Sequence, residues 1–177
     1  MGSWFQADYA TERLPSLTAV VENFDQALIN IEIKHEATRF INRDTEQKLL
    51  EVIQRYQLEH RVVISSFNPM IVNRIRKLAP HLSTAYLITQ TLTPLLIYLL
   101  ARVKASYAHV DLRYLNPRSV AGLKKAGIKV VACTLNTPAD FERAVQLGVD
   151  GILTDYPDRL RAFLHEQDLL RAKCERC

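Results

Sequence analysis

The sequence predicts an α/β protein with a parallel sheet, organised as an incomplete TIM (β/α)8 barrel with about six strand–helix units of eight. Short apolar runs alternate with amphipathic stretches along the 177 residues, as expected for parallel strands joined by right-handed crossover helices. Only five glycines are present, with no glycine-rich phosphate loop, which weakens a doubly wound interpretation. Polar residues follow nearly every expected strand, and barrels place their active sites at that rim.

The expected elements follow one pattern, in which an apolar strand is followed by a polar residue and a proline that begin the next helix. Four such pairs are present: Asn68-Pro69, Thr93-Pro94, Asn116-Pro117 and Thr137-Pro138. We expect strands at about 28–33, 62–66, 85–88, 109–112, 128–135 and 152–154, and helices at about 43–56, 69–78, 94–104, 117–126, 138–147 and 158–165.

The helix after Thr137 has the clearest boundaries. Thr137 suits the N-cap, Pro138 the first helical position, and Asp140 completes a pattern like a capping box. Gly148 stands where a left-handed C-cap is expected.

The run from Asn30 to Lys34 carries the most informative chemistry. Side chains alternate along a strand, so the isoleucines at 29, 31 and 33 face one way, and Asn30, Glu32 and Lys34 face the other. In a barrel the apolar side faces the helices, so Glu32 and Lys34 would point into the mouth, roughly 7 Å apart. A carboxylate beside an ammonium suits a divalent metal and a phosphate oxygen. The residues alone leave open an ordinary half-exposed strand with a polar outer face.

Several segments together resemble the glycerophosphodiester phosphodiesterase family, whose members are TIM barrels. They cover residues 2 to about 164, in the family's order and spacing, and are Gly2–Phe5, Glu12–Leu17, Asn30–Lys34, Val63–Asn68, Thr134–Asn136 with Pro138, and Gly148–Pro157. The resemblance implies a hydrolase of lipid metabolism that cleaves glycerophosphodiesters to glycerol 3-phosphate and an alcohol, using a divalent metal (Mg or Ca).

The resemblance also implies site roles. Glu32 would bind the metal and Lys34 would contact the phosphate. Phe67 and Asn136 would form pocket walls, and Trp4 would close over the glycerol side.

The departures from the family pattern concern the catalytic groups. The family begins with His-Arg-Gly, Glu-Asn-Thr, a Glu-x-Asp strand and a His-Asp pair, and none of these occurs here. His60-Arg61 is followed by Val62 and lies at the start of its strand, on the side opposite the site. Cys133 stands where the family commonly has tryptophan. We therefore expect no catalytic residue in this chain, and a truncated form that is inactive alone.

Two other interpretations stay open. One is a non-catalytic relic of the same fold that binds phosphate-containing ligands, and the other is an unrelated parallel α/β protein. We expect a partial phosphodiesterase domain at 1–165 and a charged C-terminal tail at 166–177, in which Cys174 and Cys177 are inert. The open barrel edges predict self-association.

Composition excludes some partners and places. The net charge is +4 and the basic residues are dispersed, so no nucleic-acid surface is expected. The apolar window 85–101 contains Gln90 and Pro94 and fits a buried strand and helix better than a membrane span. No secretory signal is evident, and three cysteines fit a reducing compartment, so we expect a cytoplasmic protein.

Overall fold

The structure is a computed structural model that describes the backbone of residues 6–34 and 43–174. The chain divides into two compact units, Met1–Ile29 with Asn42–Val62, and Asn30–Ile41 with Val63–Cys177. The family-like polar rim belongs to the second unit.

The first unit contains the short 3-10 helix η2 (Ala7–Tyr9) and the helices α1 (Leu17–Asn23) and α2 (Arg43–Arg55). Ser16 caps α1 by accepting a hydrogen bond from Ala19 N–H at 3.1 Å. The Tyr56 hydroxyl, just after α2, donates to the Glu22 carboxylate of α1 at 2.7 Å, which ties the two helices together.

The strands form a six-stranded sheet in the order β1-β2-β3-β4-β5-β6. From β2 onward each strand pairs with the next in parallel, so Ile88, Val110, Ala132 and Ile152 lie in one row across the sheet. The bounds are β1 (Ile29–Glu32), β2 (Val62–Ser66), β3 (Ser83–Ile88), β4 (Tyr107–Asp111), β5 (Lys129–Cys133) and β6 (Gly151–Ile152).

The helices of the second unit start where their caps predict. Asn68, Thr93, Asn116 and Thr137 each accept a backbone hydrogen bond at the start of a helix, and Gly148 ends α6 with φ of 68°. The helices are α3 (Pro69–Leu78), α4 (Pro94–Arg102), α5 (Pro117–Lys125), α6 (Pro138–Leu147) and α7 (Pro157–Cys174), with the 3-10 helix η3 at Leu112–Tyr114.

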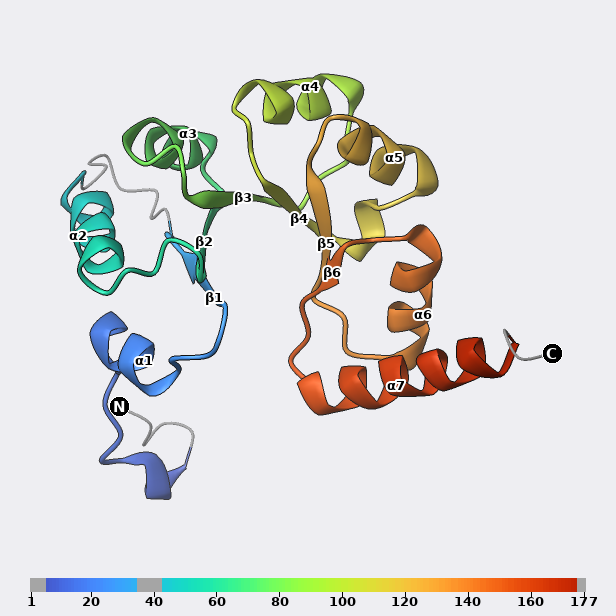
Figure 1. Cartoon of the computed structure of the whole chain (residues 1–177), viewed down its shortest axis with the longest axis horizontal. Coiled ribbons are helices and arrows are strands. Elements are labelled where there is room, and N and C mark those ends of the chain that lie inside the picture. Colours follow the sequence, from blue (N-terminus) through green and yellow to red (C-terminus); the bar gives the residue numbers. More distant parts are fainter. Residues whose placement is uncertain (1–5, 35–42, 175–177) are drawn as a thin grey trace. The chain divides into compact units, whose positions relative to one another are not determined.

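The core lies between the sheet and these helices, which flank one side of the strands (Figure 1). Ala108 and Val110 of β4 and Val130 of β5 are fully buried, together with Leu123 of α5 and Phe141 of α6. Burial of each large apolar side chain contributes about 1.5–3 kcal/mol. Because side chains alternate along a strand, those that face away from these helices lie outside this core and can be polar.

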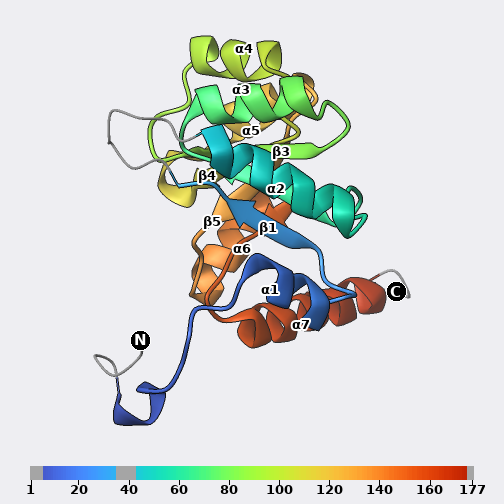
Figure 2. The same ribbon diagram turned by 90° about the vertical axis from the view of Figure 1, so that its left-hand side faces the viewer.

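Three elements differ from the expectation. The helix α1 was not predicted, and β6 is only two residues long. The last helix continues to Cys174 instead of ending near His165, across the boundary expected at residue 166 (Figure 2). The apolar window 85–101 lies in β3 and α4, and no helix among the described residues is long and apolar enough to span a membrane.

Candidate active site

The end of β1 carries the two residues that the sequence singled out. Glu32 and Lys34 are exposed, whereas Ile33 between them is buried, so the predicted alternation is confirmed. Ile33 N–H donates to the Ser65 carbonyl at 2.8 Å, and the Ser66 hydroxyl donates to the Ile33 carbonyl at 2.8 Å. These hydrogen bonds fix the carboxyl end of β1 beside that of β2.

The loop after β2 presents an exposed aromatic ring. Ser66 Oγ accepts from Asn68 N–H at 3.1 Å, and Asn68 Oδ1 accepts from Met70 N–H at 2.9 Å. Phe67 lies between these anchored residues with half of its surface exposed. It is thus held at the same strand ends as Glu32 and Lys34, as a pocket wall would be.

The end of β4 carries a carboxylate that is already paired. Arg113 Nε donates to Asp111 Oδ1 at 3.0 Å, and Nη2 donates to Oδ2 at 2.6 Å. These side-chain hydrogen bonds hold the pKa of Asp111 below its usual value, against a smaller effect of burial. Asp111 is therefore ionised, but both of its oxygens are bound by Arg113.

Asn136, after β5, is bonded to the segment after β6. Its Nδ2 donates to Asp155 Oδ2 at 2.8 Å, and its Oδ1 accepts from Asp155 N–H at 3.0 Å and from the Thr154 hydroxyl at 3.2 Å. The amide thus joins two neighbouring rim loops. Only one of the two N–H groups of Nδ2 is used in these bonds.

Cys133 lies in a recess of about 250 Å³ between the ends of β4 and β5, lined also by Asp111, Thr134 and Arg143. Burial, and to a smaller extent the Asp111 carboxylate, raise the pKa of the Cys133 thiol to about 11. The thiol is therefore protonated at neutral pH and is a poor nucleophile.

One histidine, His109, belongs to the core. It is buried in the middle of β4, on the same strand side as Asp111, and its Nδ1 has no hydrogen-bond partner among the described residues. Burial lowers its pKa to about 4. Its place two residues before Asp111 in the strand was the available clue.

The described residues do not make up a complete metal site. Among residues 6–34 and 43–174, no group of three or more His, Cys, Asp or Glu side chains could hold a metal ion. Glu32 could supply one oxygen ligand, and divalent cations of this class need several. Trp4 lies outside the described residues.

One known protein family matches nearly all of the chain. The Glycerophosphoryl diester phosphodiesterase family matches residues 1–159. The chain belongs to this family. The six-stranded sheet and the match to solved structures of this family confirm the predicted fold class, an incomplete TIM barrel of six strand–helix units.

Two relatives show the range of sequence similarity to this chain. The glycerophosphodiester phosphodiesterase of Caldanaerobacter subterraneus is 36% identical over 161 residues, which are 90% of this chain and 65% of the relative. The lysophospholipase D of Homo sapiens is 28% identical, over 90% of this chain and 59% of the relative. The chain thus spans less than two thirds of either protein.

Two solved structures show the fold. A phosphodiesterase of Oleispira antarctica, in complex with its product sn-glycerol-3-phosphate, has a TM-score of 0.79 at 21% identity, and the match covers 92% of this chain and 66% of that one. A glycerophosphodiester phosphodiesterase of Parabacteroides distasonis has a TM-score of 0.74 at 24% identity, over 84% of this chain and 61% of that one.

Proposed function

We propose that this chain supplies the phosphate-binding side of a phosphoric diester hydrolase that cleaves glycerophosphodiesters to glycerol 3-phosphate and an alcohol. The observation that carries this proposal is the end of β1, where Glu32 and Lys34 are both exposed beside the anchored Phe67 loop in a member of the family. The Lys34 ammonium would contact a non-bridging phosphate oxygen and stabilise the negative charge that develops there. Phe67 would pack on the glycerol carbons, and Asn136 and Trp4 would complete the walls.

The assembled enzyme is proposed to need Mg²⁺ or Ca²⁺, with Glu32 as one ligand. Because the described residues hold no group of three or more metal-ligating side chains, part of the ligand set would come from residues outside them.

The proposal also requires an acid–base group from elsewhere. His109 has a pKa of about 4 and is buried, so it is neutral at physiological pH and cannot donate a proton as an imidazolium. His60 precedes β2 and His81 precedes β3, at the opposite ends of the strands from the rim. His165 lies within α7, and His35 lies outside the described residues and, by the resemblance, is not one of the family's catalytic histidines. We therefore propose that the chain alone does not turn over.

A two-arm experiment tests the function. The chain alone, with Mg²⁺ or Ca²⁺ and glycerophosphocholine, should release no glycerol 3-phosphate above background, because a missing general acid alone costs about 10² to 10⁴ in rate. The same chain joined to a leading segment with His-Arg-Gly, Glu-x-Asp and His-Asp should release it. Metal-dependent turnover by the chain alone would contradict the assignment of missing groups. A joined protein that is folded but inactive with both ions would contradict the function itself.

A second candidate is a non-catalytic protein that binds phosphate-containing ligands. The hydrogen-bonded pairing of Asp111 with Arg113 favours it, because a rim carboxylate with both oxygens bound by an arginine is not available to bind a metal or to transfer a proton. An in-frame His-Arg-Gly upstream in the gene would favour the enzyme instead. A cytoplasmic location and the absence of nucleic-acid partners also belong to the proposal, on the grounds of composition.

A further inference from the structure

The outward face of α4 is apolar. Leu95, Tyr98 and Leu99 are spaced three and four residues apart, so they lie on one face of the helix, and they are 66%, 56% and 50% exposed. The inward side of the helix is also apolar, with Leu100 buried and Ile97 packed against the core. A surface helix normally turns polar side chains to water, and a helix that is apolar on all sides is normally covered.

The neighbouring helices follow the usual pattern. Beyond their first residues, α5 and α6 turn mostly charged or polar side chains to solvent, so the apolar surface is a property of α4 and not of the whole helix layer. Their exposed residues of this kind are Arg118, Lys124 and Lys125 in α5, and Glu142, Arg143 and Gln146 in α6.

The position of α4 in the fold leaves this face uncovered. α4 packs closely against α5, since a Cβ on Gly122 would lie only 3.0 Å from Ile97 Cδ1. Within the described part of the chain, the unpaired edges of the sheet are at β1 and β6. A strand–helix unit added at either edge would extend the sheet there and would not cover α4, which follows β3 (Figure 1).

Acidic residues are almost missing from this part of the chain. Residues 60–139 contain 11 of the 23 Lys and Arg residues but only one of the 19 Asp and Glu residues, and that one, Asp111, is bound by Arg113 at the rim. The helices α3, α4 and α5 have no acidic residue at all. The exposed cations on these helices or just after them are Lys77, Arg102, Lys104, Arg118, Lys124 and Lys125.

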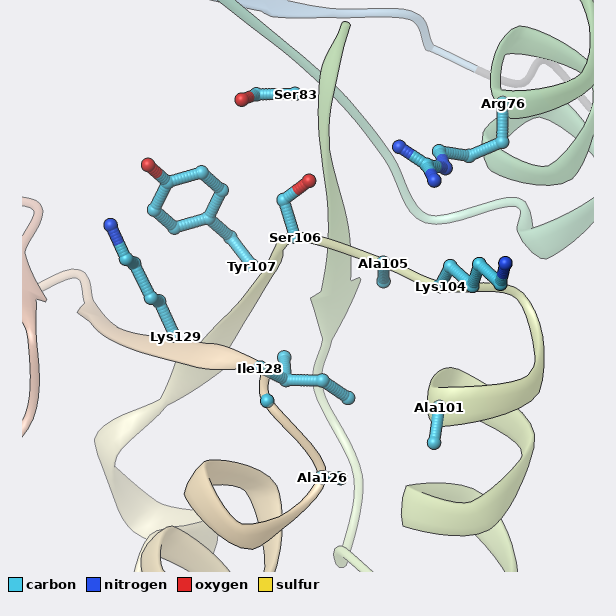
Figure 3. A pocket seen from close by; sticks show the side chains of 11 residues that line it. Arg76, Ser83, Ala101, Lys104, Ala105, Ser106, Tyr107, Ala126, Ile128 and Lys129 are labelled. Carbon is cyan, nitrogen blue, oxygen red and sulfur yellow. The ribbon is translucent and has the colours of Figure 1, made fainter. Parts of the chain in front are cut away.

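Two of these cations extend the apolar stripe. Arg102 lies three residues after Leu99, on the same face, and is exposed. Lys104 follows the helix, and Figure 3 shows its side chain pointing away from the recess that Ala101 lines. Among the described residues, neither cation forms an ion pair. The outward face of α4 thus combines apolar side chains with positive charge that no carboxylate offsets.

We propose that the outward face of α4 docks on an anionic lipid bilayer, with Leu95, Tyr98 and Leu99 inserted at the boundary of headgroups and acyl chains. Helices with an apolar face and flanking Lys or Arg bind membranes in this way, lying in the plane of the surface. The cations of α3, α4 and α5 would lie near the lipid phosphates. The proposal does not depend on the phosphodiesterase activity, because this face contains no residue of the rim.

The charge distribution favours a bilayer over the other partners of an apolar face. Two copies of this chain that met through α4 would bring their cations together without any acidic residue of α3, α4 or α5 to offset them. A nucleic acid would match the charge, but its backbone offers no apolar surface for the leucines.

Co-flotation of the full chain with lipid vesicles tests the proposal. Vesicles of phosphatidylcholine with about 30% phosphatidylserine should bind the chain at least tenfold more tightly than vesicles of phosphatidylcholine alone. Replacing both leucines, Leu95→Gln with Leu99→Gln, should weaken binding to the anionic vesicles about tenfold or more. The melting temperature should stay nearly constant, because both residue types favour helices and both positions are exposed.

The matched control makes the same double change elsewhere, as Leu14→Gln with Leu28→Gln. These leucines are 75% and 80% exposed, more than those of α4, so non-specific sticking of exposed leucines would be lost with them. The control should change vesicle affinity less than twofold. An equal loss in both double variants would overturn the proposal.

A second pair of variants tests the charge. Arg102→Gln should weaken binding to the anionic vesicles about fivefold, whereas Arg161→Gln on α7, also exposed, should change it less than twofold. Binding to the two kinds of vesicle with equal affinity would overturn the proposal. So would an absence of vesicle binding, and if the α4 leucine variant then had a smaller mass in light scattering, this face would contact a second copy instead.

Discussion

Asn136 and Asp155 are joined by two hydrogen bonds, in which the Asn136 amide donates to the Asp155 carboxylate at 2.8 Å and accepts from the Asp155 backbone at 3.0 Å. The two residues follow β5 and β6. Their contact fixes the last two rim loops of the sheet relative to each other, so a residue assigned to the substrate pocket is also a structural clamp.

The first prediction concerns this clamp. Asn136→Ala removes three hydrogen bonds at a partly buried position and should lower the free energy of unfolding by about 1–2 kcal/mol. Asn136→Asp should be at least as damaging, because two carboxylates would then face each other. Urea denaturation measures both. Gln54→Ala at an exposed position of α2 is the control and should stay within about 0.5 kcal/mol. Wild-type stability of Asn136→Ala would show that the clamp contributes nothing.

The second prediction follows from His109. Its pKa is about 4 in the folded chain and about 6.5 when unfolded. The unfolded chain therefore binds more protons between these values, and stability must fall as the pH drops from about 6.5 to 4, by at most about 3 kcal/mol. His109→Met cannot titrate, so its stability should decline less over this window. Denaturation midpoints at several pH values measure the difference.

Other acidic groups also titrate at low pH, so the comparison between variants is the decisive quantity. His81 is exposed, and a His81→Gln curve should overlay that of the unchanged chain. Parallel curves for His109→Met and the unchanged chain would show that His109 does not titrate as its burial requires.

Local sequence signals accounted for part of the fold. The cap pairs predicted the first residues of α3, α4, α5 and α6, and Gly148 predicted the end of α6, because a cap is a property of adjacent residues. The expected end of the last helix near His165 was wrong. No glycine or proline follows His165, so α7 continues to Cys174. The short α1, with Ser16 as its cap, lies in a stretch without the apolar strand that marked the other units.

The site was predicted only in part for a different reason. Glu32 and Lys34 were found from the alternation of a single strand. The Asn136–Asp155 bonds and the burial of His109 depend on which strands are neighbours and in what register. Such contacts join residues about 20 positions apart and leave no periodic pattern.

The third prediction concerns the two ends of the sheet. Within the described part of the chain, β1 and β6 each pair with one strand only, which leaves an unpaired edge on both. Unpaired edges are templates for association. The isolated chain should therefore form oligomers or be unstable, with a mass in light scattering that rises with concentration. A sharp monomer with cooperative two-state melting would contradict this expectation.

The last prediction tests the β1 site in the joined protein that carries the leading motifs. Glu32→Gln keeps the shape but removes the charge, so it should weaken Mg²⁺ or Ca²⁺ affinity and lower turnover together, each at least tenfold. Lys34→Met keeps much of the apolar stem and removes the cation, so it should lower turnover with little change in metal affinity. Metal titrations and initial rates measure both quantities.

The matched controls make the same chemical changes on exposed positions of α2, as Glu51→Gln and Lys48→Met. Exposed substitutions usually stay within about 0.5 kcal/mol, so the controls should leave metal affinity and turnover nearly unchanged. The contrast matters because Glu32 and Lys34 are themselves exposed, and an ordinary polar strand face would behave like α2. If neither β1 variant moves either quantity by tenfold, the assignment of β1 as the active-site strand is wrong. A fall in metal affinity for Lys34→Met as large as that for Glu32→Gln would instead remove the division of roles between the two residues.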